Sequence, residues 1–174
     1  MDFLNLSQSR CSIRGFTKKN VSDDDLTMLL KAAQSAPSAG NCQPWHFYVI
    51  RDKNVKVEIA SKATRQPFIA TAPVVIVVCA DIMANKEYYG SRGKTLYCIQ
   101  DTAAATQNIL LCATSLGLGA CWCGAFDEKT VSKVLALSND RRPVAIIPVG
   151  YPSDEQLDPA DRTPLDDIVT FIGK

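Results

Sequence analysis

The hydrophobic positions of the chain recur first at a helical period. The stretch "VSDDDLTMLLKAAQS" (residues 21–35) has one apolar helical face, made of Leu26, Leu29, Leu30 and Ala33. Ser22 with Asp25 three residues later resembles an N-terminal capping box, and Pro37 follows as a stop. The pattern predicts a helix that ends before Pro37.

Apolar runs without helical spacing predict strands. "HFYVI" (46–50) ends in a polar turn, and "PVAIIPVGYP" (143–152) ends its strand at Gly150. "PVVIVVCA" (73–80) is β-branched and apolar on both faces. Such a run is typical of the central strand of a sheet.

Two further helices are predicted between and after these strands. "DTAAATQNILLCATSL" (101–116) is small or apolar nearly all round, which indicates a helix buried by its neighbours or by another subunit. Gly117 and Gly119 supply its stop signal. "DEKTVSKVLAL" (127–137) begins with Asp127 as an N-cap. Its apolar face consists of Val131, Val134 and Leu135.

Composition and charge narrow the classes of function. The 174 residues are 47% hydrophobic and 21% charged, which fits one globular domain over residues 1–174. Nineteen basic against eighteen acidic residues leave a net charge of +1 without a basic stripe, so we expect no nucleic-acid partner. No signal-peptide core and no long apolar run occur, so we expect a cytoplasmic protein without membrane contact.

The last stretch, "SDEQLDPADRTPLDDIVTFIGK" (153–174), finishes in the apolar "IVTFI". A terminal segment of this kind must be covered by something, and a second copy of the chain is the simplest cover. We therefore predict a homodimer. Arg162 stands alone among acids and prolines in this stretch, and by itself it indicates no more than a surface salt bridge.

The thiols do not form a recognisable site. The seven cysteines are an odd number, and several lie in apolar runs where a thiol acts as a small hydrophobe. Cys121 and Cys123 lack the two-residue gap of redox and zinc motifs, and the single histidine, His46, is far away in sequence. We predict no metal site and no catalytic side chain.

The stretch "RCSIRGF" begins at Arg10. In an extended strand Arg10, Ser12 and Arg14 share one face, while Cys11 and Ile13 point into the core. Two guanidinium groups and a hydroxyl on one face make a phosphate clamp, because arginine offers a planar fork of donors. The alternative is a solvated basic edge strand, and on spacing alone that alternative is favoured.

The stretch "APSAGNCQPW" (36–45) carries more turn chemistry than a connection between a helix and a strand needs. Gly40 lets a backbone approach a ligand closely. Asn41 and Gln43 offer donors and acceptors, and Trp45 offers an aromatic wall. The alternative is a plain connector, which also favours proline and glycine.

Taken together, the chain resembles the nitroreductase family of FMN-dependent oxidoreductases over nearly its whole length. The resemblance rests on six blocks in order: "RCSIRGF", "APSAGNCQPWHFYVI", "APVVIVVCA", "DTAAATQNILLCATSLGLGACWCGAFD", "IIPVGYP" and "DRTPLDDI". It implies an α+β fold with a central, mostly antiparallel sheet flanked by helices. It also implies an intertwined homodimer with two FMN sites at the interface, in which each C-terminal tail reaches the partner's sheet.

The resemblance also implies roles for particular residues. The ribityl chain and phosphate of FMN would contact Arg10, Ser12, Arg14 and Arg162, with Cys11 contributing its backbone where many members carry arginine or histidine. The isoalloxazine ring would be lined from the opposite subunit by Pro37, Ser38, Ala39 and Asn41. The backbone of Cys123, Gly124 and Ala125 would lie beside N5, and Gln66 would reach the pyrimidine end of the ring.

The activity implied is a ping-pong reaction on one flavin face. NAD(P)H reduces FMN and departs, and a nitroaromatic, a quinone or another small acceptor takes its place. Among the enzymes, a specialised relative such as a reductive dehalogenase, a flavin-fragmenting enzyme or an enoate or azole oxidase is the alternative. A non-catalytic FMN-binding dimer and a cysteine-based redox or metal protein also stay open. Residues 81–100 replace a longer helical insertion that covers the substrate channel in larger members, so the acceptor stays open.

Overall fold

Four antiparallel strands form the central sheet in the order β1-β2-β4-β3. The computed structural model describes residues 2–153 and 160–173. The strands are β1 (Trp45–Ile50), β2 (Val74–Asp81), β3 (Gly119–Ala120) and β4 (Arg141–Gly150). The predicted antiparallel sheet is confirmed. So is the central position of β2, which pairs on both sides and is buried from Val74 to Ala80.

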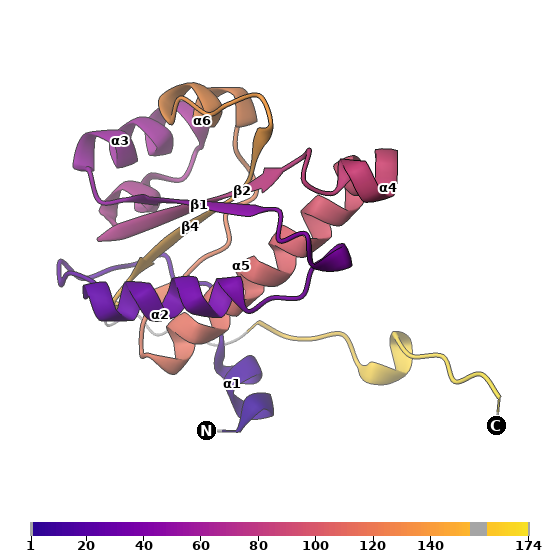
Figure 1. The fold of residues 1–174 in the computed structure, drawn as a ribbon. Coiled ribbons are helices and arrows are strands. Elements are labelled where there is room, and N and C mark those ends of the chain that lie inside the picture. The colour runs from indigo at the N-terminus through magenta and orange to yellow at the C-terminus, as the bar shows by residue number, and fades with distance from the viewer. Residues whose placement is uncertain (1, 154–159, 174) are drawn as a thin grey trace.

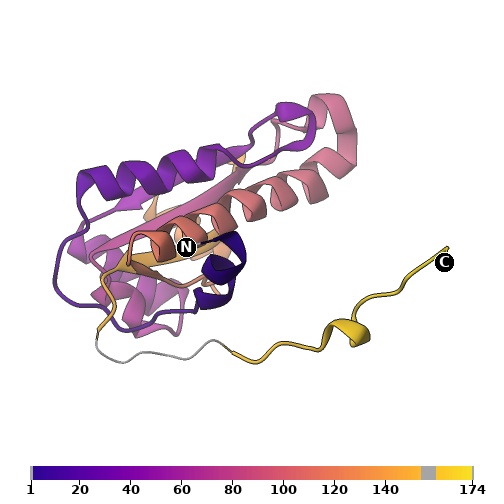
Figure 2. The same cartoon turned by 90° about the horizontal axis from the view of Figure 1, so that it is seen from below.

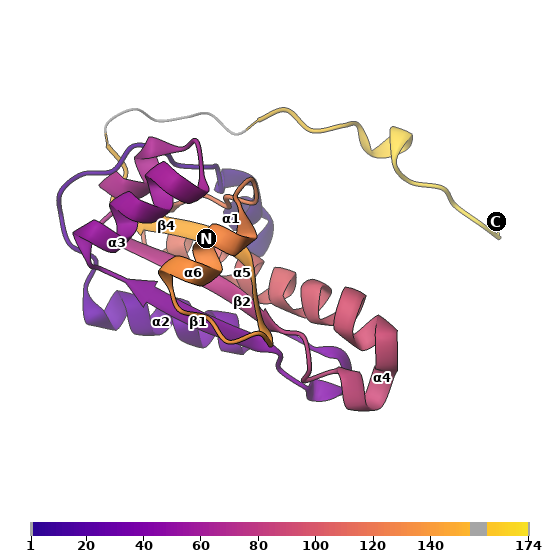
Figure 3. The same ribbon diagram turned by 90° about the horizontal axis from the view of Figure 1, so that it is seen from above.

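Helices cover both faces of this sheet (Figure 1). Helices α2 (Asp23–Gln34) and α5 (Cys98–Ser115) pack on one face, as the view from below shows (Figure 2). Helices α3 (Lys53–Glu58) and α6 (Glu128–Val134) cover the other face, as the view from above shows (Figure 3). The remaining α-helices are α1 (Phe3–Ser9) and α4 (Lys86–Arg92).

The alternation of β2 divides the core into two clusters. Val74, Ile76 and Val78 face α2 and α5, whereas Val75, Val77 and Cys79 face the side of α3 and α6. Both faces of β2 are therefore filled by hydrophobic side chains, because successive residues of a strand point to opposite faces. The continuous apolar run seen in the sequence is the consequence of this double burial.

The helix signals in the sequence correspond to real caps. Ser22 Oγ accepts from Asp25 N at 3.0 Å at the start of α2, and Asp127 caps α6 by accepting from Thr130 N at 2.8 Å. Helix α5 ends as predicted, since Gly117 has a φ of 70° and Leu118 N donates to Ala113 O at 2.8 Å. It begins three residues earlier than predicted, at Cys98 rather than Asp101.

The sequence pattern missed the short helices. Helices α1, α3 and α4 have only six or seven residues each, too few for the apolar period to repeat. Helix α1 is preceded by its N-cap Asp2, whose side chain accepts from Asn5 N at 2.9 Å, so its only signal was one capping residue.

The C-terminal segment, residues 160–173, leads away from the rest of the molecule (Figures 1 and 2). Leu165, Ile168 and Ile172 are exposed by 72%, 65% and 94%, so the apolar side chains that were predicted to need a cover are not covered within this chain. Separately, each helix within the described residues is too short or too polar to cross a membrane.

Candidate functional site

Residues 10–16, which we call segment 10–16, extend along the outer edge of β3. Ile13 N donates to Ala120 O at 3.0 Å, and Phe16 forms a bridge with Pro152 beyond the end of β4. Gly119 makes the close approach possible, because a Cβ there would lie 2.7 Å from Ile13 Cβ. The predicted extended conformation is therefore built by main-chain pairing to the sheet.

Three side chains of segment 10–16, those of Arg10, Ser12 and Arg14, influence the thiol of Cys121. The pKa of Cys121 is lowered to about 6, first by the hydrogen bond from Cys123 and then by the charges of Arg14 and Arg10 and a hydrogen bond with Ser12, against the opposing effect of burial. Cys121 is only 3% exposed, so these charges act on a buried thiol. Both arginines contribute positive charge at this thiol, and the shared face predicted for Arg10, Ser12 and Arg14 stays a prediction.

After Cys123 the backbone leaves the sheet, and two of its N–H groups have no acceptor among the described residues. Cys123 pairs with Ile146 through both main-chain hydrogen bonds, at 2.9 and 3.0 Å. Gly124 and Ala125 are exposed, and neither of their N–H groups donates to another residue in the ranges 2–153 and 160–173. Gln66 Nε2 donates to Ala125 O at 3.4 Å, so the structure brings this predicted residue to the same place.

Loop 36–45 has an unusual backbone. Gly40, Asn41 and Gln43 have φ values of 57°, 54° and 48°. For Asn41 and Gln43 this left-handed conformation costs roughly 1 to 2 kcal/mol per residue. Ser38 Oγ accepts from Gln43 N at 3.0 Å and closes the loop on itself. A plain connector would not need strained residues, and such strain is typical of functional positions.

Trp45 ends loop 36–45 and lines a surface pocket together with residues of α2, among them Leu30 and Gln34. It is the first residue of β1 and packs against the core cluster between the sheet and helices α2 and α5. The ring is only partly buried there, and the interpretation of Trp45 as an aromatic wall stays a prediction. The neighbouring His46 is exposed, and its ring lies 4.8 Å from that of Tyr48.

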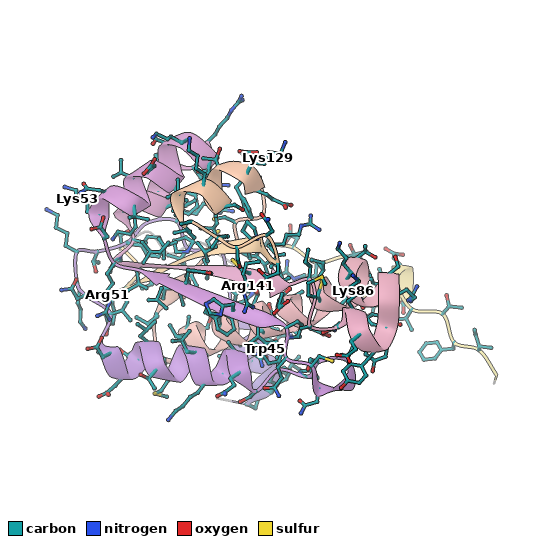
Figure 4. All side chains as sticks on the ribbon, turned by 45° about the horizontal axis from the view of Figure 1, so that its top comes forward. Trp45, Arg51, Lys53, Lys86, Lys129 and Arg141 are labelled. Carbon is teal, nitrogen blue, oxygen red and sulfur yellow. The ribbon has the colours of Figure 1, made fainter. Side chains whose placement is uncertain are left out.

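Segment 10–16 and loop 36–45 lie at opposite corners of the sheet. Loop 36–45 leads into β1 at one edge. Segment 10–16 lies outside β3 at the other edge, four strand spacings or roughly 19 Å away. The two segments also lie at opposite ends of β2. Trp45 pairs with Ala80 at one end of this strand. The end of β4 beside segment 10–16 pairs with Val74 at the other end, roughly 20 Å away along β2. Figure 4 shows Trp45 toward the α4 side and Arg51 at the far end of β1.

Arg162 is not brought to the other arginines within this chain. It is exposed on the segment that leaves the body, and it forms no hydrogen bond or ion pair with the described residues. Two groups of predicted site residues therefore stay apart in one chain. Those gathered along the β3 edge are Arg10, Cys11, Ser12, Arg14, Gln66, Cys123, Gly124 and Ala125. Those placed elsewhere are Pro37, Ser38, Ala39, Asn41 and Arg162.

All seven cysteines are free thiols in the structure, and Cys79, Cys98, Cys121 and Cys123 are buried. Burial raises the pKa of Cys79 to about 12, which makes it an inert core residue. Within the described residues, no three His, Cys, Asp or Glu side chains gather closely enough to hold a metal ion. The sequence pattern did not predict that Cys121 lies near the charges of segment 10–16.

Comparison with known proteins decides the family. The model described as "Nitroreductase family" matches residues 8–67 and 57–151. The chain belongs to the nitroreductase family. The predicted resemblance is therefore confirmed, and with it the predicted class of protein, an oxidoreductase enzyme.

The relatives of this nitroreductase-family chain span it almost completely. A relative from Archaeoglobus fulgidus, whose name joins NADH dehydrogenase with NAD(P)H nitroreductase, is 37% identical over 88% of this chain and 87% of its own length. The NADH dehydrogenase of Thermus thermophilus is 30% identical over 98% of this chain and 96% of its own length.

Solved structures of the family have the same fold. A nitroreductase family protein from Streptococcus pneumoniae superposes with a TM-score of 0.89 at 28% identity, covering 98% of this chain and all of the other. An FMN-dependent nitroreductase from Clostridium difficile superposes with a TM-score of 0.82 at 27% identity, covering 99% of each chain. The predicted α+β fold is confirmed.

Proposed function

We propose that this chain is an NAD(P)H-dependent FMN oxidoreductase that forms its two FMN sites between two copies of itself. The observation that carries the proposal is the order of residues along the β3 edge: Arg14 on the segment that pairs with Ala120, then Cys121, then Gly124, whose N–H has no partner among the described residues. The names of the relative from Archaeoglobus fulgidus and of the Clostridium difficile structure support NAD(P)H and FMN as the cofactors.

The residues along this edge fit the two ends of FMN. Arg10 and Arg14 add to the effect of the Cys123 hydrogen bond in lowering the pKa of Cys121, and a phosphate dianion is the group that such a pair of guanidinium groups prefers. At the other end, the N–H groups of Gly124 and Ala125 are exposed donors without a partner among the described residues. Gln66 lies beside Ala125 and is our proposal for the pyrimidine end of the ring.

A second copy of the chain is required to complete this site. Loop 36–45 and segment 10–16 lie at opposite corners of one sheet, so one flavin ring cannot touch both walls within one chain. In a dimer, loop 36–45 of one protomer can face segment 10–16 of its partner. The exposed apolar side chains of residues 160–173 support the same arrangement, in which the tails are exchanged and Arg162 joins the phosphate.

The protein's part in the reaction is to bind and orient. FMN, when bound, supplies hydride transfer between NAD(P)H and a small acceptor. Arg10, Arg14 and Arg162 hold the phosphate, and the N–H groups of Gly124 and Ala125 present donors to the ring. We assign no side chain as an essential acid or base. A cytoplasmic location stays a prediction.

The test is whether the purified protein is yellow and loses its colour with NADH or NADPH without oxygen. We expect a flavin spectrum with about one FMN per chain and bleaching within seconds, because the proposed site leaves one face open to both substrates. Bound FMN that neither nucleotide reduces would instead identify a non-catalytic FMN dimer. Protein without flavin affinity would contradict the proposal. A specialised relative would also bleach, and a panel of nitroaromatic, quinone, halogenated and enoate acceptors distinguishes it.

A further inference from the structure

Loop 36–45 needs support from outside, because its left-handed residues do not hold their conformation alone. The main support is the carboxylate of Asp101 in α5. Its Oδ1 accepts from Ala39 N at 3.1 Å, in the turn directly before Gly40. Asp101 is 7% exposed and is the one acidic side chain among the buried residues of the described ranges. A buried charge is costly unless hydrogen bonds satisfy it, so this position has a specific purpose.

The same carboxylate also holds the segment that leads into α4. Asp101 Oδ2 accepts from Asn85 Nδ2 at 2.8 Å, and Asn85 is fully buried. The packing around Asn85 is tight, since a Cβ at Gly93 would lie 2.1 Å from Asn85 O. One carboxylate therefore joins three elements: α5, loop 36–45 and the start of α4.

A second contact connects α4 with loop 36–45. A Cβ at Gly40 would lie 2.7 Å from the hydroxyl of Tyr89, so the Tyr89 side chain occupies the space beside that glycine. Tyr89 N in turn donates to Asn85 O at 3.0 Å. The loop is thus contacted by Asp101 of α5 and by Tyr89 of α4, and Asn85 forms a hydrogen bond with each of these two residues.

We propose that Asp101 is a positioning residue for the FMN reaction, which fixes loop 36–45 and α4 as one unit so that Asn41 is presented to the flavin of the partner subunit. The inference rests on the proposed function. In this proposal Asp101 does not contact FMN or substrate. Its carboxylate acts through its hydrogen bonds with Ala39 and Asn85.

Two substitutions separate the geometry of this network from its charge. Asp101→Ala removes both acceptors, and we expect the Kd for FMN to rise roughly ten- to a hundredfold, the range for one lost hydrogen bond to a charged group. Asp101→Asn keeps Oδ1 for Ala39. Its new amide can donate to Asn85 Oδ1, a buried atom with no partner among the described residues, once the Asn85 amide turns. We therefore expect Asp101→Asn to bind FMN within about threefold of wild type.

Asn108→Ala is the matched control. Asn108 also lies on α5, and its Nδ2 donates to Ala32 O of α2 at 2.9 Å, so its loss removes a similar contact without touching loop 36–45. FMN affinity is measured by flavin fluorescence, unfolding by thermal melts, and the ring environment by visible circular dichroism at saturating FMN. We expect Asp101→Ala alone to change the dichroism of the bound ring. An equal change with Asn108→Ala would mean a purely structural role and would overturn the proposal.

A third variant keeps the test valid if Asp101→Ala does not fold. Asn85→Asp places two carboxylates against each other at pH 8, and we expect FMN binding to weaken at least about tenfold. Adding Asp101→Asn to it exchanges the two side chains and should restore affinity. Wild-type protein without FMN affinity contradicts the proposed function. If the wild-type protein binds FMN and either Asn85→Asp or a folded Asp101→Ala variant binds it equally well, only the role of Asp101 is contradicted.

Discussion

Segment 10–16 and loop 36–45, the two proposed walls of the FMN site, are held in opposite ways. Segment 10–16 is extended and fixed by main-chain hydrogen bonds, such as Ile13 N to Ala120 O at 3.0 Å. Loop 36–45 has left-handed residues and short turns of its own, and its main chain is held by the side chains of Ser38 and Asp101. Because main-chain pairing is largely independent of side-chain identity, segment 10–16 can vary its chemistry without losing its shape. Loop 36–45 cannot, since its shape itself depends on particular side chains.

Deleting the tail separates the two walls and has the largest expected effect. A chain that ends at Ser153 should keep its sheet and helices, because residues 160–173 lie away from the body (Figure 3). It should become monomeric and bind FMN at least about a hundredfold more weakly, since each proposed site loses both Arg162 and the partner's loop. Light scattering and flavin titration measure the two effects. A dimeric truncated chain with wild-type FMN affinity would contradict tail exchange.

Removing the charges tests segment 10–16 with the main chain left intact. Arg14→Ala and Arg162→Ala each remove one charge-assisted contact of about 1.5 to 3 kcal/mol, so the double variant should lose at least about a hundredfold in FMN affinity. Lys18→Ala is the control, because Lys18 is an exposed cation of the same region that we place outside the site. Its FMN affinity should stay within about twofold. Unchanged binding in the double variant would refute the phosphate assignment.

The thiol beneath segment 10–16 gives the smallest expected effect. The pKa of Cys121 is lowered to about 6 in the folded protein, below the ordinary thiol value of 9.0, by Cys123 first and then by Arg14. Between these values the unfolded state binds more protons, so this contribution to stability is complete above pH 9 and is lost as pH falls toward 6.

FMN-free wild-type protein should therefore gain free energy of unfolding relative to Cys121→Ser between pH 6 and pH 9. Urea titrations of both proteins across this range check the sign, and parallel profiles would show that Cys121 stays protonated. Cys123 does not complicate this window, because its hydrogen bond with Cys121 and its burial raise the pKa of its thiol.

The sequence predicted those features that depend on local patterns. The caps at Ser22 and Asp127 and the burial of β2 follow from neighbouring residues, and the structure confirms them. The convergence of Arg14 and Cys121 was not predictable from spacing, because it depends on the pairing of residues far apart in the chain. Asp101 did leave a signal, as one charge at the start of an otherwise apolar helix, but its partners Ala39 and Asn85 appear only in three dimensions.

The most direct test of the central claim, that each FMN site combines two chains, is a mixed dimer. One protomer carries Arg10→Ala with Arg14→Ala, and its partner carries Ser38→Ala with Asn41→Ala. If the walls come from different chains, one site of this dimer holds every substitution and the other holds none. The account predicts that half of the sites bind FMN with wild-type affinity, although each variant alone binds weakly. A mixed dimer without any site of wild-type affinity would contradict it.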